Sequence, residues 1–527
     1  MTDLEEGLKK IPEGIQATPA VIKMFESFGP KYIWFAVITS MLGSFSTLLT
    51  GTIINVAIPE VMGAFGIGQD KAQWLSTAFL AAGTVTMLLT SWCIQALGMR
   101  VTYISAMLIF LGGSILGGLA PNHEILIFSR IITGAAAGIM GPIAMVLTFQ
   151  IFPVKSRGFA MGIFGIGVVL APALGPALGG YLIDHFSWRY VFFLAIPFSV
   201  VSIPLAIVFM PQRDGDESPQ ALDWIGFLLS SIFLVFSLTA LSDGLREGWG
   251  SNYIISLFGI SGISFIAFIW WESIVENPLL DLRIFTYGRF VASALVTFTV
   301  GIGIYGSTYL VPLFLQNMQG VMPTDSGLLM LPAGLAMAAC FPLAGALSDR
   351  IQPGIVIFVG LLLFAFSSWL MRNIDVNTAY QSILIWALIG RVGLAFIFPS
   401  LNAASMASLP LSMLSQGSGA VNFLRQLGGA FGVNILSIHL TQSTIEHSHH
   451  LSVAASPIAM DTLIKIQDMM FNNHLGYILQ FPASYGFLSN SIYNQALTMA
   501  FREGFILIAI VFFIALVPTL FMRVKRT

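Results

Sequence analysis

Residues 189–210 read RYVFFLAIPFSVVSIPLAIVFM, an apolar stretch with no charged residue after Arg189. A single helix needs roughly 20 apolar residues to cross the roughly 30 Å of hydrocarbon in a bilayer, so this stretch is long enough to span one. Hydrophobic residues make up 56% of the 527 residues and charged residues only 9%, well below the roughly 25% of a soluble domain. The stretch therefore predicts a membrane-spanning helix in a chain whose surface faces lipid.

Working outward from this stretch, the same hydropathy pattern recurs along the chain and predicts fourteen spans. The short alternating segments of a transmembrane barrel are absent, so the predicted fold class is an all-α integral membrane protein. The spans are expected at 33–58, 74–97, 101–120, 124–149, 159–183, 189–210, 222–242, 252–271, 290–315, 324–347, 354–371, 380–401, 417–440 and 497–521.

The distribution of basic residues predicts the orientation. If the N-terminus is cytoplasmic, fourteen Lys and Arg residues fall on the inner side: Lys9, Lys10, Lys23, Lys31, Arg100, Lys155, Arg157, Arg213, Arg283, Arg289, Arg350, Arg523, Lys525 and Arg526. Five fall outside: Lys71, Arg189, Arg246, Arg372 and Lys465. This bias follows the positive-inside rule, and an even number of spans then places both termini in the cytoplasm.

Two segments outside the spans carry patterns of their own. Ahead of the first span, Val21, Met24, Phe25 and Phe28 recur at helical spacing and predict a short amphipathic helix. This helix would lie either on the inner leaflet or against the cytoplasmic face of the protein. The segment 441–496 is predicted to be a long outer loop, with a short helix at 461–471.

The outer loop contains four histidines, and clustered histidines can bind metal. In a polar loop, the grouping of His447, His449 and His450 with the more distant His474 is more typical of solvated sequence. We therefore predict no metal site. The two cysteines, Cys93 and Cys340, lie in separate apolar runs and offer neither a disulfide framework nor a CxxC pair.

Arginines inside the spans are candidate functional residues. A charge near the bilayer centre costs at least about 2.5–3.5 kcal/mol, so it is retained for a reason. Arg130, in the fourth span, and Arg391, in the twelfth, occupy corresponding places if the seventh and eighth spans are an insertion. The alternative for each is a structural clamp on backbone carbonyls.

Several motifs recur in a fixed order along nearly the whole chain. They are Leu49–Pro59, Gly175–Gly180, Ser187–Phe193, Leu222–Gly226, Asn277–Phe285, Pro312–Gln316, Gly327–Pro332 and Asn422–Gly429. In this order and spacing the chain resembles the drug:proton antiporters of the major facilitator superfamily, specifically the fourteen-span EmrB/QacA-type family.

The resemblance implies a fold and an activity. The fold would be two six-helix bundles, at 32–212 and 286–527, with an inserted helix pair at 213–285 and a cytoplasmic segment at 1–31. The outer loop 441–496 would belong to the second bundle. The activity would be secondary active efflux of small amphipathic compounds by alternating access. The resemblance implies that a proton gradient drives it and that it needs no cofactor.

Two other readings remain open. The same fold would serve an uncoupled facilitator or an importer of organic anions. A membrane enzyme or receptor is disfavoured because no HExxH motif and no buried cluster of histidines and acids is present. The resemblance also implies a bacterial inner membrane protein, in contact with lipid but not nucleic acid. As in the Gram-negative members of the family, a periplasmic adaptor that leads to an outer-membrane channel would contact residues 441–496, the alternative being a pump that works alone.

The resemblance assigns a gating role to Gly175, Pro176, Gly179 and Gly180, which would hinge and seal the cavity. Small residues at this spacing also let helices approach closely. A second gating motif is Asp349 and Arg350, predicted in the cytoplasmic loop after the second helix of the C-terminal bundle. Its N-terminal counterpart is degraded, because Gln95 and Ala96 replace the family's charged pair.

The coupling residue is where this chain departs from the family. Thr50 stands where the family has an aspartate in the first span, and threonine cannot carry a proton. The carboxylates nearest to a span centre are Glu60, Asp325 and Glu503. We expect Glu503 to couple transport to protons, the alternative being an interfacial ion pair with Arg502.

The remaining candidates are predicted walls of the substrate cavity: Asn55, Trp74, Gln316, Arg391, Asn402, Asn422 and Arg425. A cavity that bears Arg130 without a nearby carboxylate is expected to favour neutral or anionic substrates over lipophilic cations.

Overall fold

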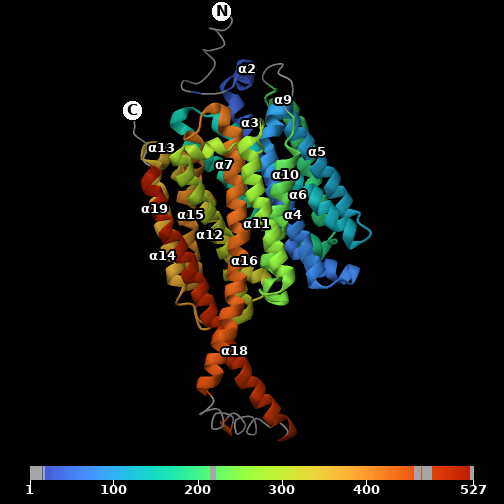
Figure 1. The fold of residues 1–527 in the computed structure, drawn as a ribbon, viewed down its shortest axis with the longest axis vertical. Coiled ribbons are helices and arrows are strands. Elements are labelled where there is room, and N and C mark those ends of the chain that lie inside the picture. The colour runs from blue at the N-terminus through green and yellow to red at the C-terminus, as the bar shows by residue number, and fades with distance from the viewer. Residues whose placement is uncertain (1–14, 16–17, 214–220, 456–463, 466–476, 523–527) are drawn as a thin grey trace, which may run out of the picture.

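The computed structural model describes residues 15, 18–213, 221–455, 464–465 and 477–522, and these are helical apart from turns and connections. The helices form one elongated bundle (Figure 1). One end carries the short helix α2 (Pro19–Phe28), and we call it the α2 end. At the opposite end two helices project beyond the others, and we call it the hairpin end.

The helices fall into two halves and an inserted pair. The N-terminal half contains α3 (Tyr32–Phe65), α4 (Gln69–Leu97), α5 (Met99–Gly118), α6 (His123–Ile151), α7 (Arg157–His185), α8 (Tyr190–Phe193) and α9 (Ala195–Phe209). The inserted pair is α10 (Trp224–Glu247) and α11 (Asn252–Ile274). The C-terminal half contains α12 (Gly288–Gln319), α13 (Pro323–Arg350), α14 (Pro353–Met371), α15 (Tyr380–Ala407), α16 (Leu414–Ala455), α18 (Tyr477–Ile514) and α19 (Leu516–Thr519).

The membrane-spanning character predicted from hydropathy is confirmed. Among the described residues, 13 helices are long and apolar enough to cross a membrane. The remaining predicted span, 417–440, lies within α16, which has 42 residues but is more polar. The chain is therefore a multi-pass membrane protein with about fourteen long helices. The exact domain boundaries at 212 and 286 stay a prediction.

The predicted outer loop is wrong in form. Both ends of the predicted loop are helical. The helix α16 continues to Ala455, and α18 begins at Tyr477, some twenty residues before the predicted span. These extensions project at the hairpin end (Figure 1). Hydropathy missed them because the extensions are polar enough to face water, while helix formation does not require an apolar surface. Apart from residues 464–465, the helix expected at 461–471 lies outside the described residues.

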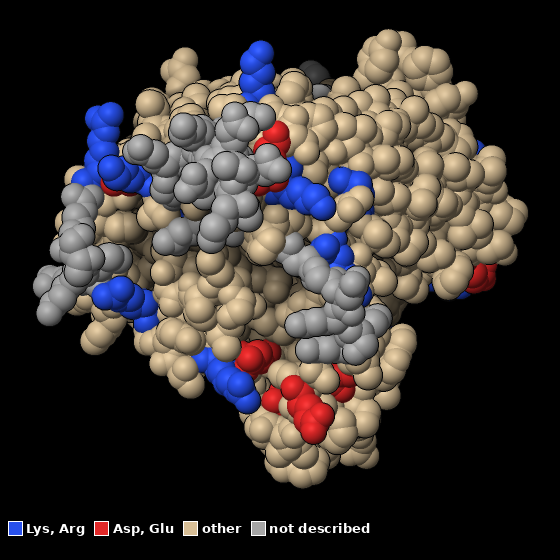
Figure 2. All heavy atoms as spheres, turned by 90° about the horizontal axis from the view of Figure 1, so that it is seen from above, with Lys and Arg blue, Asp and Glu red and all other residues tan. Residues whose placement is uncertain are grey.

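The amphipathic helix α2 packs on the protein. Val21 and Phe25 are fully buried, and Phe25 meets Tyr32 edge-on with ring centroids 5.0 Å apart. Phe28 lies against Phe209 of α9 at 5.2 Å. The apolar stripe therefore belongs to the core of the N-terminal half, which favours the packed alternative. Seen from this end, Lys and Arg side chains are spread over the face (Figure 2).

The inserted pair packs mainly on itself. Ser261 and Ser264 of α11 donate hydrogen bonds to the carbonyl oxygens of Phe233 and Leu229 on α10, at 3.2 and 2.7 Å. Small residues allow this close approach. Large exposed side chains such as Ile263 and Trp270 cover the outer surface of the pair, as expected for helices that face lipid.

Candidate functional site

The two halves make their closest contact at the α2 end, between α7 and α13. A side chain on Gly162 would come within 2.5 Å of the Phe341 carbonyl oxygen, and one on Gly158 or Gly345 would collide with the backbone of the facing helix. Only glycine permits this approach. The two backbones are therefore in direct contact where helices of different halves meet.

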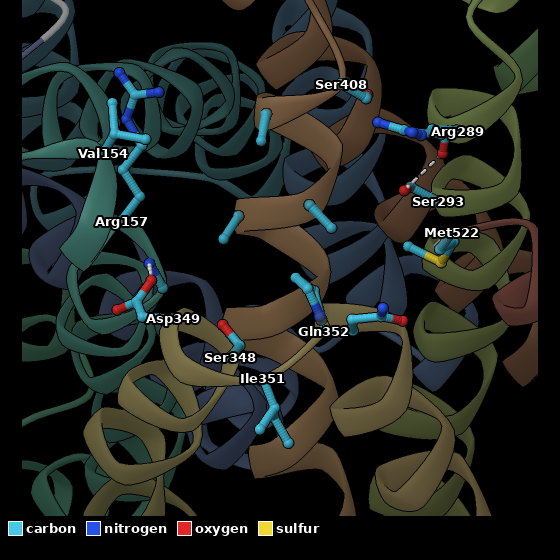
Figure 3. A pocket seen from close by; sticks show the side chains of 15 residues that line it. Val154, Arg157, Arg289, Ser293, Ser348, Asp349, Ile351, Gln352, Ser408 and Met522 are labelled. Carbon is cyan, nitrogen blue, oxygen red and sulfur yellow. Dashed lines mark hydrogen bonds between the residues drawn. The ribbon is translucent and has the colours of Figure 1, made fainter. Parts of the chain in front are cut away.

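Asp349 ties the two halves together at this contact. Its carboxylate accepts a hydrogen bond from the backbone N–H of Gly158 at 2.7 Å (Figure 3). It accepts another from the backbone N–H of Phe159 at 2.9 Å. Those groups belong to the first turn of α7, where unpaired N–H groups and the helix dipole attract negative charge. Asp349 and Arg350 close α13 rather than lie in the loop that the sequence predicted. The anion is held by a helix N-terminus of the opposite half.

A second contact joins α16 of the C-terminal half to α4 and α6. The Ser91 and Ser415 hydroxyls lie 3.0 Å apart, and Ser418 donates to the Pro142 carbonyl oxygen at 3.0 Å. A side chain on Gly419 would come within 2.8 Å of the Met87 carbonyl oxygen. All these residues lie in the parts of their helices nearest the α2 end. We call this set of contacts, together with those between α7 and α13, the seam.

A pocket of about 220 Å³ opens at the seam (Figure 3). Both halves line it, through Val154 and Arg157 on one side and Arg289, Ser293 and Gln352 on the other. Arg157 is nearly buried, with its guanidinium over the Phe149 ring at 4.1 Å and its Nε donating to the Phe149 carbonyl oxygen at 3.2 Å. The pocket lies at the end face of the bundle and not at its centre.

A polar cluster lies further toward the middle of the C-terminal half. Arg425 donates to Asn402 Oδ1 at 3.4 Å and to Asn422 Oδ1, and its guanidinium lies 4.7 Å from the centre of the Phe398 ring. Asn422 also lies against the N-terminal half, with its Nδ2 3.5 Å from Met145 Sδ. The structure thus brings together three of the predicted cavity residues, at the place where the halves face one another. Their role in binding stays a prediction.

Arg130 is fully buried in the N-terminal half. Its Nε donates to the Leu75 carbonyl oxygen at 3.0 Å, and the guanidinium lies 4.2 Å from the centre of the Phe79 ring. Neither Nη1 nor Nη2 has a hydrogen-bond partner. The clamp on a backbone carbonyl therefore uses one of the three nitrogens, and two buried nitrogens, which carry four N–H donors, are left for another acceptor.

Arg391 lies in a different setting from Arg130. It donates to Thr308 Oγ1 at 2.9 Å and lines a small cavity with Met330, Ser367 and Phe505. The structure keeps it apart from Arg425. Arg391 therefore pairs with a hydroxyl between α12 and α15 rather than with the central polar cluster.

The other predicted cavity residues are dispersed. Gln316 donates to Ser326 at 2.9 Å, and Trp74 is 44% exposed. The side chain of Asn55 lies outside the described part of the chain. Glu60 and Asp325 are exposed at the hairpin end, and Thr50 is buried and donates to the Ser46 carbonyl oxygen at 3.0 Å.

The glycine motif of α7 contacts its own half. A side chain on Gly175 would meet Thr52, and one on Gly179 would meet Ile53, both on α3, whereas Gly180 faces open space. The side chain of Pro176 lies outside the described residues. The structure thus supports the close-packing interpretation at these positions, and the hinge role stays a prediction.

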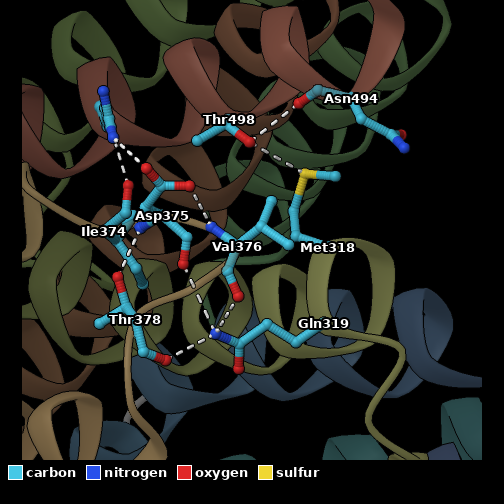
Figure 4. Close-up of polar contacts among 9 residues, drawn as sticks. Met318, Gln319, Ile374, Asp375, Val376, Thr378, Asn494 and Thr498 are labelled. Carbon is cyan, nitrogen blue, oxygen red and sulfur yellow. Dashed lines mark hydrogen bonds and ion pairs between the residues drawn. The ribbon is translucent and has the colours of Figure 1, made fainter. Parts of the chain in front are cut away.

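Glu503 belongs to α18, and its side chain lies against the part of α16 near the hairpin end. Its carboxylate lies 2.8 Å from His447 Nε2 and 3.4 Å from His439 Nε2, and it accepts a hydrogen bond from Ser443. Arg502 turns to the connection before α15, where it bonds the Ile374 carbonyl oxygen at 2.8 Å and lies 3.4 Å from Asp375. Gln319 of α12 holds the same connection through the carbonyl oxygens of Val376 and Thr378 (Figure 4). Glu503 is therefore paired with histidines and not with Arg502.

Sequence reasoning missed both histidines. From hydropathy alone, His439 lies within an expected span and His447 in an expected solvated loop. The signal was present, because His439, Ser443 and His447 recur every four residues and so share one face of a helix. In the described part of the chain, no group of three or more His, Cys, Asp and Glu residues is arranged to hold a metal ion.

The sequence is similar to a family of known proteins. The family model of the Major Facilitator Superfamily matches residues 40–433. The multidrug transporter protein MdtP of Bacillus subtilis is 31% identical over 75% of this chain and 73% of its own length. The probable multidrug resistance protein EmrY of Escherichia coli is 27% identical over 93% and 95% of the two chains.

A third relative is the colistin resistance protein EmrB of Acinetobacter baumannii, 27% identical over 94% of this chain and 97% of that protein. Among solved structures, the human organic anion transporter MFSD10 has a TM-score of 0.59 at 14% identity, covering 91% of this chain and 99% of its own. The proton:xylose symporter XylE has a TM-score of 0.58 at 12% identity, covering 91% and 95%. These structural likenesses concern the fold alone.

Proposed function

We infer the function from the premise that this chain belongs to the Major Facilitator Superfamily. It is a secondary active exporter of small amphipathic compounds, as its relatives MdtP and EmrY, named for multidrug transport and multidrug resistance, and EmrB, named for colistin resistance, indicate. It is not an enzyme: it moves its substrate by alternating access, with the two halves rocking about a central site.

The observation that carries this proposal is the seam. The contacts of Asp349 with α7 and of Ser418 with α6 join the halves at the α2 end. Arg425, Asn402 and Asn422 lie beyond that contact, where substrate entering from the other end would meet them. A structure closed at one end with a polar cluster behind the closure is one of the two states that alternating access requires.

The direct experiment is counterflow in proteoliposomes, with and without a pH gradient. An exporter accumulates labelled substrate against unlabelled substrate in both conditions and responds to the gradient. Exchange that ignores the gradient would instead assign the uncoupled facilitator.

Substrate charge is expected to follow from the arginines. Arg425 and the unpartnered nitrogens of buried Arg130 would supply positive charge to the cavity. Thr50 stands where a carboxylate would supply negative charge. Neutral and anionic amphipathic compounds should therefore compete better for transport than lipophilic cations. Competition assays with matched compounds that differ only in charge test this preference.

We propose that protons drive export through Glu503. The Glu503 carboxylate lies against His439 and His447 of α16, so a proton bound there would lie between two helices of the C-terminal half. Glu503→Gln should abolish uptake driven by a pH gradient in everted vesicles and preserve downhill exchange of substrate. Intact gradient-driven uptake in this variant would move coupling to Glu60 or Asp325.

The proposed location is a bacterial inner membrane with both termini in the cytoplasm, so that the α2 end is the inner end. The charge bias of fourteen basic residues against five supports this orientation. Cysteines placed in the α16 extension should react with an impermeant reagent from outside, and cysteines beside Lys155 or Arg350 should not. Labelling beside Lys155 from outside would overturn it.

We further propose that the projecting parts of α16 and α18 contact a periplasmic adaptor that leads to an outer-membrane channel. Their length beyond the bundle is the supporting feature (Figure 1). A pull-down from cells should recover the adaptor with the full chain and lose it when these extensions are shortened. Recovery of the same partners after shortening, or of none with the full chain, would favour a pump that works alone.

A further inference from the structure

Two buried carboxyl groups meet at the α2 end of the inserted pair. Asp223 caps α10 by accepting the Gly226 N–H at 2.9 Å, and the same oxygen accepts the Trp271 indole N–H at 2.8 Å. Glu272, in the last turn of α11, accepts the Leu280 N–H at 3.1 Å through Oε2. The relative exposure is 8% for Asp223 and 3% for Glu272.

The second oxygen of each group has no partner. Asp223 Oδ2 and Glu272 Oε1 are buried and make no hydrogen bond. Both lie against the same glycine, because a side chain on Gly226 would collide with both oxygens. The two unpartnered oxygens are thus near neighbours in a space that the missing side chain of Gly226 leaves open.

Among the described residues near the two carboxyl groups, no positive charge balances them. No described Lys, Arg or His forms an ion pair with Asp223 or Glu272. Of the charged residues on the connection that follows α11, Glu276 is exposed, and Arg283, whose side chain is 83% exposed, lies 4.0 Å from Asp281. The neighbouring helix α16 contributes the neutral Gln416, and the adjacent end of α4 carries no charged residue.

Two carboxylates that share a buried site cannot both ionise, because like charges in a poorly solvated place repel strongly. A buried acceptor without a donor also destabilises the fold. One proton between the two oxygens removes both penalties, since it neutralises one group and supplies the missing hydrogen bond. We propose that Asp223 and Glu272 form a proton-binding site that holds one shared proton at neutral pH.

This site is connected to the seam. Gln416 of α16 accepts the Asp281 N–H at 3.3 Å and donates to the Pro278 carbonyl oxygen at 3.5 Å, which fixes the connection after Glu272. Its neighbour Ser415 makes the contact with Ser91 across the halves. The proton site therefore lies beside a helix that must move when the α2 end opens, and at the opposite end from Glu503.

Infrared spectroscopy of the purified full chain tests the proposal. At neutral pH the carbonyl stretch of a protonated carboxyl group should be present, and Glu272→Gln should remove it. The matched control is Glu276→Gln, which alters an exposed carboxylate on the same segment and should leave the band unchanged. An identical band in wild type and Glu272→Gln would overturn the proposal.

Thermal unfolding supplies a second readout. Glutamine and asparagine mimic a protonated carboxyl, so Glu272→Gln and Asp223→Asn should unfold within a few degrees of wild type, whereas Glu272→Ala should unfold earlier. Wild-type stability should fall as the pH rises and the shared proton leaves, and Glu272→Gln should lose most of that pH dependence. A sodium-dependent rise in wild-type stability that Glu272→Gln abolishes would overturn the proton and assign a bound cation.

Discussion

Near the α2 end, α7 lies against α13 of the opposite half, whereas near the hairpin end it lies against α3 of its own half. Glycines make both contacts close. At Gly158 and Gly162 an added side chain would meet the backbone of Gly345 and Phe341. At Gly179 an added Cβ would meet mainly the Ile53 side chain, at 2.6 Å from its nearest atom.

The difference separates two uses of one residue type. The contact with α3 joins helices that travel together, so it has to be permanent. The contact with α13 joins helices of different halves, so alternating access requires it to break and reform. Small residues alone do not distinguish a gate from ordinary packing. What distinguishes them is whether the partner helix belongs to the same half or to the other half.

The largest effect is expected at a residue outside both contacts. Arg130→Ala should reduce transport to background while expression stays near normal, because the buried guanidinium carries two nitrogens without a hydrogen-bond partner. Arg130→Lys should restore transport only in part, since lysine lacks the planar fork of donors. Transport assays in everted vesicles with protein levels matched by immunoblot measure this, and a wild-type rate in Arg130→Ala would show that the residue is only structural.

Breaking the contact between halves should have the next largest effect. In Gly162→Val the new side chain meets the Phe341 backbone, which cannot rotate away. We expect α7 and α13 to separate, the α2 end to open, and transport to fall by at least about tenfold, the change that 1.4 kcal/mol would produce in an equilibrium. Accessibility of a cysteine at Val154 to a thiol reagent reports the opening, and unchanged accessibility with normal transport would contradict the role of this contact.

Asp349→Asn should weaken the same contact without adding bulk. The substitution keeps an acceptor for one N–H of α7 but loses the charge, and a hydrogen bond to a charged group contributes about 1.5–3 kcal/mol. The closed state should lose population by roughly tenfold or more on this scale, which the same cysteine accessibility would detect. Asp349→Glu serves as the control that keeps the charge, and equal behaviour of Asn and wild type would remove the electrostatic part of the account.

The smallest effect on transport is expected at the contact between α7 and α3. Gly179→Ala must displace the Ile53 side chain, and overpacking of this kind costs about 1–3 kcal/mol of stability. Transport should change little, because α3 and α7 move together. Thermal unfolding and initial transport rates measured on the same preparation decide it; a strong loss of transport with normal stability would restore the hinge role predicted for the glycine motif.

The sequence predicted most of the fold, because the apolar spans and the order of the motifs depend on local composition. It predicted residues such as Arg425 and Asn422 in the cavity, and the structure brings them together. Their partners could not be predicted in the same way. That Asp349 binds the first turn of α7 depends on how two helices 190 residues apart are placed.

The errors of the sequence analysis have physical causes. The helical extensions of α16 and α18 are polar, so a hydropathy profile interprets them as a loop. The same profile gives no sign that His439 and His447 contact Glu503, although their spacing places them on one face of a helix. Asp223 lies at the start of α10 and Glu272 at the end of α11, and only the folded pair shows that their unpartnered oxygens lie against the same glycine.

A disulfide across the seam tests the central claim most directly. The Ser91 and Ser415 hydroxyls are 3.0 Å apart, so cysteines at both positions, with Cys93 and Cys340 replaced by serine, should cross-link on mild oxidation. The account predicts that cross-linked protein does not transport and that reduction restores the rate, while each single cysteine variant stays active throughout. Full transport by the cross-linked protein would contradict a cycle in which the α2 end opens between the two halves.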